Sequence, residues 1–171
     1  MTLKIDLREK SGHRMCPEDL MLLAIEEARK GMTAGHGGPF GAVISMEGRI
    51  IASAHNTVLG DNDPTRHAEI SAISLAARKL GDLDLSGCEL YTTTEPCPMC
   101  FSAIHWAKIS RIVFGTSIED VRKRGFNELS IPVWTMKDLG GSPVRIEGGF
   151  MEPECEKLLE EWDSLPVKRV Y

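Results

Sequence analysis

Two short stretches, His67-Ala68-Glu69 and Pro96-Cys97-Pro98-Met99-Cys100, decide the fold and the chemistry expected of this chain. They supply one imidazole, a Cys-x-x-Cys pair of thiols, and one carboxylate close to the histidine. Three nitrogen and sulfur ligands with a fourth position left open are typical of a catalytic zinc ion. The sequence therefore predicts that His67, Cys97 and Cys100 bind one Zn²⁺ per chain, with a water molecule at the fourth position.

Glu69 is the candidate catalytic residue, because it lies beside the expected metal ligands without being one of them. A zinc ion lowers the pKa of its bound water to about 7, which makes hydroxide available at neutral pH. A carboxylate next to that water can take its proton and pass it on, which is general acid–base catalysis.

A structural zinc site and a redox pair of cysteines are the alternatives to a catalytic zinc site. A structural site needs four protein ligands, usually as two pairs, and the chain has a single Cys-x-x-Cys pair. His105 follows Cys100 on the same expected helix, at a spacing that points the two side chains in different directions. The proline before Cys97 and the upstream His-x-Glu motif disfavour a redox pair. A non-catalytic structural zinc module therefore stays as the alternative of another class.

The composition is that of a globular protein, with 171 residues, 42% of them apolar and 26% charged, which predicts one domain over residues 1–171. The formal net charge of −5 argues against a protein that coats nucleic acid. No stretch approaches the roughly 18 apolar residues of a membrane span, and residues 1–6 lack the apolar core of a signal peptide. We expect a cytoplasmic protein with no membrane partner, in which Cys16, Cys88 and Cys155 are reduced.

Helical and strand-like patterns alternate along the chain, which predicts an α/β layered fold. Helices are expected at 17–31, from about 67 to 77, and at 97–107, 119–124 and 153–162. The helix that carries His67 is expected to be capped by Thr65 or Asp63. Strands are expected at 41–45, 49–53, 88–93, 109–115 and 144–146, and residues 130–141 are expected to be irregular.

Longer phrases around the zinc motifs resemble the cytidine-deaminase-like superfamily of zinc deaminases, from about residue 20 to about residue 125. Within this superfamily, the sequence motifs are most similar to those of guanine and guanosine deaminases. The phrases are Gly37-Gly38-Pro39-Phe40-Gly41-Ala42-Val43, then Asn62-Asp63-Pro64-Thr65 before His67, then Glu95 to Cys100 with Ala103-Ile104-His105-Trp106. The resemblance implies a three-layer α/β/α fold with a central mixed five-stranded sheet, usually in a homodimer.

The resemblance also implies roles in substrate binding for residues outside the zinc motifs. Asn56 matches an asparagine that hydrogen-bonds a purine, and the backbone amide of Ala68 would contact the base near the metal. Further matches are Phe40 and Trp106 as aromatic walls, Glu119 or Asp120 as the acid that binds the guanine edge, and Tyr171 at the end of a tail, about 164–171, that closes the pocket.

The function implied is zinc-dependent hydrolytic deamination of a small-molecule purine, with guanine or guanosine converted to xanthine or xanthosine and ammonia. Residues 144–159 resemble the end of bacterial tRNA adenosine deaminases instead. The alternative within the superfamily is therefore a tRNA-specific adenosine deaminase that converts adenosine to inosine in the anticodon loop. Only under that alternative is nucleic acid a partner.

Overall fold

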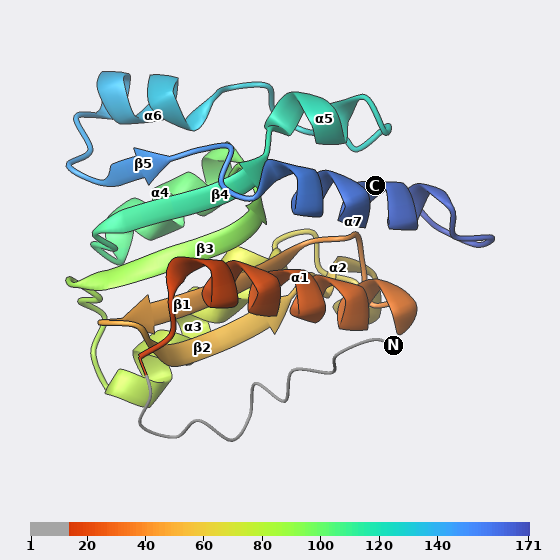
Figure 1. Cartoon of the computed structure of the whole chain (residues 1–171). Coiled ribbons are helices and arrows are strands. Elements are labelled where there is room, and N and C mark those ends of the chain that lie inside the picture. The colour runs from red at the N-terminus through yellow and green to blue at the C-terminus, as the bar shows by residue number, and fades with distance from the viewer. Residues whose placement is uncertain (1–13) are drawn as a thin grey trace.

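The computed structural model describes residues 14–171 and has one mixed sheet with strand order β2-β1-β3-β4-β5 (Figure 1). Antiparallel pairing joins β1 to both β2 and β3, whereas β3, β4 and β5 run parallel. The strands are β1 (Gly41–Met46), β2 (Arg49–His55), β3 (Cys88–Thr94), β4 (Arg111–Thr116) and β5 (Arg145–Glu147). The predicted mixed five-stranded sheet is therefore confirmed.

Helices cover both faces of the sheet. They are α1 (Pro17–Thr33), α2 (Val58–Asp61), α3 (Ala68–Leu80), α4 (Pro98–Trp106), α5 (Ile118–Arg122), α6 (Val133–Gly140) and α7 (Glu152–Asp163). Figure 1 shows α1 and α7 in front of the sheet and α3 and α4 behind it. This is the predicted three-layer α/β/α arrangement.

Alternating side chains along the strands build the two cores of the molecule. On β1, Ala42 and Ile44 pack with α3 and α4, while Val43 between them packs with α1 and α7. The same alternation separates Ile112 from Val113 on β4. Successive side chains of a strand point to opposite faces, so a central sheet needs apolar residues at every position.

Two helices differ from the sequence-based expectation. The segment expected to be irregular at 130–141 contains α6, which is short, buries one side chain, Val133, and follows Pro132 without a capping side chain. The short helix α2 has no predicted counterpart, and it ends at Asn62 in the left-handed conformation. The other expected elements are present, with boundaries that shift by one or two residues at most of their ends.

The helix caps at the zinc motifs also differ from expectation. His67 itself is the N-cap of α3, and no side chain caps the helix. Asp63 instead accepts hydrogen bonds from the backbone and hydroxyl of Thr65, at 2.9 and 2.7 Å, which shapes the loop before the helix. The prediction that Thr65 or Asp63 caps α3 is therefore wrong, and the first amides of α3 stay available to the site.

Residues 1–6, for which the sequence indicates no signal peptide, lie outside the described residues, and so does the first part of the expected domain. Within residues 14–171, none of the helices combines the length and the apolar character needed to cross a membrane.

Candidate active site

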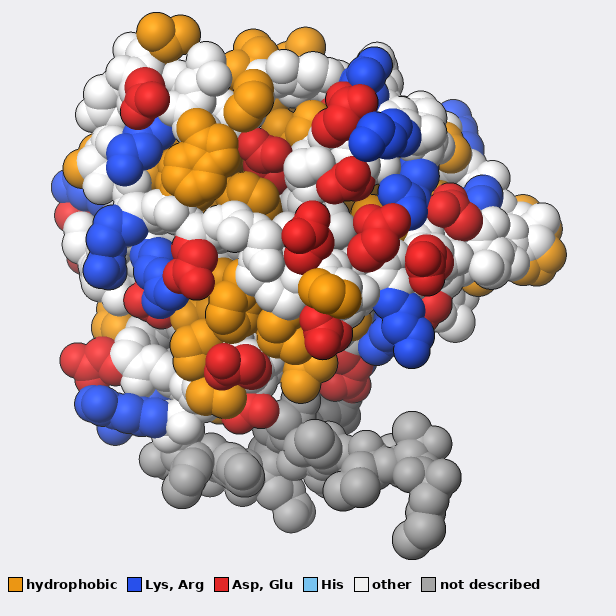
Figure 2. Space-filling view, turned by 45° about the horizontal axis from the view of Figure 1, so that its top comes forward, with side chains coloured by type: hydrophobic (Ala, Val, Ile, Leu, Met, Phe, Trp, Pro, Cys, Tyr) orange, Lys and Arg blue, Asp and Glu red, His pale blue; other side chains and the backbone are white. Residues whose placement is uncertain are grey.

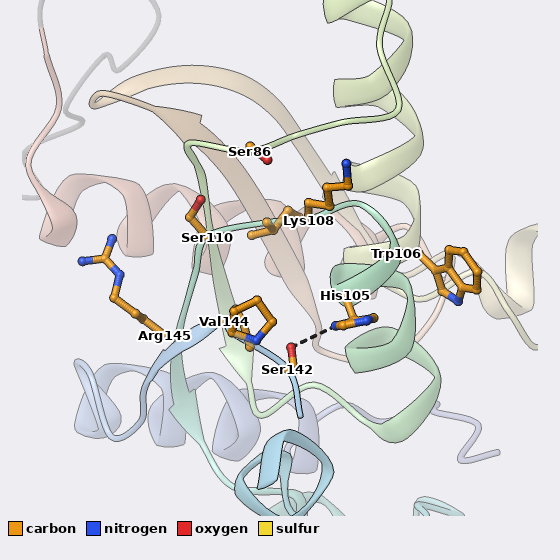
Figure 3. Close-up of a pocket in the computed structure, with 10 residues that line it drawn as sticks. Ser86, His105, Trp106, Lys108, Ser110, Ser142, Val144 and Arg145 are labelled. Carbon is orange, nitrogen blue, oxygen red and sulfur yellow. Dashed lines mark hydrogen bonds between the residues drawn. The ribbon is translucent and has the colours of Figure 1, made fainter. Parts of the chain in front are cut away.

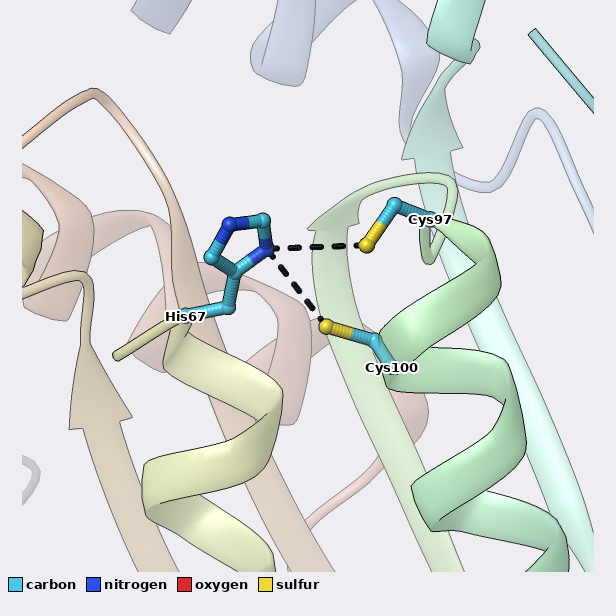
Figure 4. Close-up of side chains that lie close together, drawn as sticks. All are labelled: His67, Cys97 and Cys100. Carbon is cyan, nitrogen blue, oxygen red and sulfur yellow. Dashed lines mark hydrogen bonds between the residues drawn. The ribbon is translucent and has the colours of Figure 1, made fainter. Parts of the chain in front are cut away.

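The three expected metal ligands come together where the N-termini of α3 and α4 meet. His67 is the N-cap of α3, Cys97 is the N-cap of α4, and Cys100 lies in the first turn of α4. Their side chains point toward one another (Figure 4). His67 Nδ1 lies 3.7 Å from Cys97 Sγ and 3.5 Å from Cys100 Sγ. Among the His, Cys, Asp and Glu side chains of residues 14–171, these three are close enough together to hold a metal ion.

These separations fit a tetrahedral zinc ion. Zinc bonds of about 2.3 Å to sulfur and about 2.0–2.1 Å to nitrogen place such donor atoms about 3.6 Å apart. The Cys100 thiol donates a hydrogen bond that lowers the pKa of Cys97 to about 4, with a smaller contribution from His67. The pKa of Cys100 is raised by its hydrogen bond to Cys97 and by burial. One thiolate therefore forms readily, and the second needs a cation beside it.

Glu69 lies in the first turn of α3 and is 6% exposed. Thr92, on the central strand β3, donates a hydrogen bond to Glu69 Oε1 at 3.2 Å. The Cys100 thiol lies 3.6 Å from the other oxygen, Oε2, which places the carboxylate beside the metal site but outside the metal trio. Burial raises the pKa of Glu69, which suits a group that takes up and releases a proton.

Thr92→Val is expected to lower kcat by about three- to tenfold, because Glu69 loses the hydrogen bond that fixes Oε1. Steady-state turnover measures this effect, and bound zinc should be unchanged. Thr93→Val is the matched control, since the Thr93 hydroxyl accepts from the Gly41 amide rather than contacting Glu69. Equal losses in the two variants would contradict a positioning role for Thr92.

The predicted base-binding residue Asn56 lies directly after β2 and is 1% exposed. Its Oδ1 accepts hydrogen bonds from the Val58 amide at 3.2 Å and from the Tyr171 hydroxyl at 2.6 Å. Its Nδ2 is buried, and no other group of residues 14–171 accepts a hydrogen bond from it. A buried amide donor without a partner is costly, so this atom is a candidate contact for a ligand.

The C-terminal tail reaches this asparagine within the same chain. The Tyr171 hydroxyl, besides donating to Asn56, accepts from the Gly38 amide at 3.0 Å. The Tyr171 ring packs edge-on against Phe126, which in turn packs edge-on against Phe40. The structure thus gathers Phe40, Asn56 and Tyr171 around one point.

Trp106 lies elsewhere. It ends α4, at the opposite end of that helix from the cysteines, and is 84% exposed. It lines a separate groove of about 730 Å³, where the neighbouring His105 contacts Ser142 at 3.0 Å (Figure 3). Within one chain, Trp106 therefore does not reach the metal site, and His105 is not a fourth ligand.

The two acids predicted to bind the base are engaged in local contacts. Glu119 is exposed and forms a two-pronged ion pair with Arg122. Asp120 forms a capping box with Ser117 at the start of α5, and this contact lowers the pKa of Asp120. Neither carboxylate is brought to the metal trio.

Glu128 is the acid near the site that the sequence patterns do not reveal. Burial raises its pKa to about 7, and the charges of Cys97, His67 and Glu69 act on it as well. Its neighbour Asn127 donates a backbone hydrogen bond to the carbonyl of Tyr171. Glu128 lies in a loop without a motif, and its only sequence signal is its position directly after Phe126-Asn127.

Glu95 links the segment that carries Cys97 to two other helices. This buried carboxylate precedes the Pro-Cys-Pro-Met-Cys phrase and accepts hydrogen bonds from two helix N-termini. The Val133 amide of α6 donates at 2.8 Å, and the Ile118 amide of α5 donates at 3.1 Å. One side chain therefore ties α5 and α6 to the segment that presents Cys97.

The geometry agrees with the comparison to known families. The pattern of the "Cytidine and deoxycytidylate deaminase zinc-binding region" matches residues 15–116, which include the three ligands and Glu69. The chain belongs to this deaminase family. It is a zinc-dependent aminohydrolase, and the deaminase gathers the side chains of His67, Cys97 and Cys100 at two helix N-termini.

Relatives of this deaminase include guanine deaminases and tRNA-specific adenosine deaminases. The guanine deaminase of Bacillus subtilis is 45% identical over 111 residues, which cover 65% of this chain and 71% of the relative. The tRNA-specific adenosine deaminase of the same organism is 42% identical over 136 residues, covering 80% and 81%. A solved guanine deaminase from Nitrosomonas europaea superposes with a TM-score of 0.81 at 33% identity, covering 88% of this chain and 86% of that one.

Proposed function

We propose that this deaminase converts the free purine guanine to xanthine and ammonia. The observation that carries the proposal is the position of its own C-terminal tail, with Tyr171 hydrogen-bonded to Asn56 and Gly38. A tail in this position would close over a free base, whereas an RNA loop needs an open approach to the reacting base. The similarity to two guanine deaminases supports the same substrate.

Surface charge also favours a small substrate. The formal net charge is −5. On the face shown in Figure 2, Lys and Arg side chains are interspersed with Asp and Glu side chains rather than gathered into one patch. Proteins that bind RNA draw much of their affinity from clustered basic residues, so this face offers little to a tRNA.

In the proposed mechanism, the residues of the chain bind the base and move protons. His67, Cys97 and Cys100 would hold zinc, which as a Lewis acid would make hydroxide available at neutral pH. Glu69 takes a proton from the attacking water and delivers it to the ring nitrogen beside C2 of guanine. It then passes the proton of the new hydroxyl group to the amine, so guanine and water give xanthine and ammonia.

Base recognition is assigned to groups of both hydrogen-bonding kinds. Asn56 Nδ2 is a buried donor that can bind an acceptor of the purine ring. Glu128 supplies an acceptor. Guanine has an N–H donor at N1, where adenine has an acceptor. The Ala68 amide at the start of α3 is a further donor near the metal. Phe40 remains the proposed aromatic wall.

Glu128→Gln is expected to raise KM for guanine by about tenfold or more, since a hydrogen bond to a charged group is worth about 1.5–3 kcal/mol. Glu119→Gln and Asp120→Asn are the comparison variants, and neither should change KM by more than about twofold if their local contacts are their role. Initial rates over a range of guanine concentrations measure all three. If only Glu119→Gln or Asp120→Asn raises KM strongly, that acid binds the base, as the sequence predicts.

The second candidate function is deamination of adenosine in a tRNA anticodon loop. The similarity to a tRNA-specific adenosine deaminase over four fifths of the chain favours it. Ammonia release across guanine, guanosine, adenine, cytosine, cytidine and an anticodon stem-loop separates the two. We expect the highest kcat/KM with guanine, and turnover of the stem-loop alone would overturn the proposal.

We also propose one zinc ion per chain, a homodimer and a cytoplasmic location. The one metal trio found within residues 14–171 supports the zinc count. All five cysteines are free thiols, which suits a reducing compartment.

A further inference from the structure

Two histidines contact each other beside Asn56, and the function proposed above uses neither. His36 lies in the glycine-rich loop after α1, and His55 is the last residue of β2. Their rings stack with centroids 5.3 Å apart and an interplanar angle of 21°. His36 Nδ1 and His55 Nε2 are 3.0 Å apart, which is a hydrogen-bond distance.

The contact continues into α1. His55 Nδ1 lies 3.5 Å from Glu27 Oε2, and Lys30 donates to Glu27 Oε1 at 2.7 Å. A neutral imidazole has one donor and one acceptor nitrogen. With both rings neutral, this geometry fits His55 protonated on Nδ1, because the carboxylate can only accept, with His55 Nε2 accepting from His36 Nδ1. In that arrangement, Glu27 sets the tautomers of both rings.

Each histidine directly precedes a residue at the proposed base-binding site. His36 is followed by Gly37 and Gly38, and His55 is followed by Asn56. A Cβ atom on Gly37 would lie 2.0 Å from Asn56 Oδ1, so the loop and the asparagine are in direct contact. Gly38 meets the same asparagine through the Tyr171 hydroxyl.

The backbone of His36 is fixed on both sides. Its amide donates to the Gly31 carbonyl at 3.0 Å, and its carbonyl accepts from the Leu59 and Gly60 amides, both at 2.9 Å. The His55 ring packs against α1 at Gly31, where a Cβ atom would lie 2.6 Å from it. The histidine pair therefore joins α1, the glycine-rich loop, α2 and the end of β2 at one place.

We propose that Glu27, His55 and His36 form a hydrogen-bonded relay that positions Asn56 and the Gly37-Gly38 loop for base binding. The inference rests on the proposed function, in which Asn56 contacts the purine. The histidines are positioning residues, since they act through Asn56 and do not touch the base. Breaking the relay is expected to weaken substrate binding and to leave the chemistry at Glu69 intact.

His36→Leu removes the relay, and His36→Asn keeps a donor near the place of Nδ1. We expect His36→Leu to raise KM for guanine by about two- to tenfold, the range for loss of one hydrogen bond, with kcat within about twofold of wild type. His36→Asn should restore KM. His105→Leu is the matched control, because it breaks a histidine contact of the same 3.0 Å length far from Asn56.

An unchanged KM in His36→Leu, an equal rise in His105→Leu, or a failure of His36→Asn to restore KM would overturn the proposal. Nitrogen NMR of the wild-type protein tests it without any variant: His55 protonated on Nδ1 supports the relay, and neutral His55 protonated on Nε2 overturns it. If the wild type deaminates the stem-loop and not guanine, the proposed substrate fails. The same variants then test the relay through KM for the stem-loop.

Discussion

Glu69→Gln is expected to lower kcat by about 10²–10⁴-fold, the usual contribution of a positioned general acid–base group. The amide keeps the shape of the side chain and can still contact Thr92, but it cannot carry the proton between water and amine. The metal trio does not include Glu69, so the variant should retain its zinc. Turnover and metal analysis on the same preparation measure both quantities.

Glu154→Gln on the exposed surface of α7 is the control for loss of a carboxylate, and it should retain full activity. If Glu69→Gln loses zinc together with activity, the carboxylate supports the metal site rather than the chemistry. A variant that keeps its zinc and more than about a tenth of wild-type kcat would contradict the assignment of Glu69 as proton carrier.

Glu95→Ala is expected to lower the free energy of unfolding by about 3–5 kcal/mol, since two charge-assisted hydrogen bonds are lost and two amides are left unpaired. Those amides begin α5 and α6. Both helices flank the segment that contains Phe126 and Glu128, so substrate binding should weaken as well. Urea unfolding followed by circular dichroism measures the stability.

Glu89→Ala on β3, the strand that directly precedes Glu95, is the matched control. Its carboxylate is 27% exposed, pairs with Arg111 at 3.2 Å and accepts from the Tyr91 hydroxyl at 2.9 Å, so the expected loss is about 1–2 kcal/mol. Similar losses from Glu95→Ala and Glu89→Ala would show that the buried carboxylate does not hold the two helices.

The sequence predicts the fold correctly where buried apolar residues recur in a regular pattern. Strands such as β1 and β4 are apolar at nearly every position, because helices cover both faces of the sheet. Helix α6 escaped prediction because it is short, buries one side chain, Val133, and begins after Pro132 without the polar cap that signals a helix start. The cap of α3 escaped because the nearby Thr65 and Asp63 bond each other, so local turn chemistry outcompeted capping.

The metal site could be predicted from the sequence because its chemistry requires fixed residue types at short spacings. His67, Cys97 and Cys100 meet as expected, with Glu69 beside them. The supporting groups Thr92, Glu95 and Glu128 reach the site through strand register and loop packing, which no short motif encodes. Trp106 follows the same phrase in the sequence but lies at the opposite end of α4 from the cysteines, where it is exposed.

The most direct test of the account is to incubate the zinc-loaded protein with guanine in water enriched in heavy oxygen and to analyse the products by mass spectrometry. We predict xanthine that carries one heavy oxygen atom at C2, with one ammonia released for each xanthine formed. Unchanged guanine, in a preparation that converts adenosine to inosine in an anticodon stem-loop, would contradict the account.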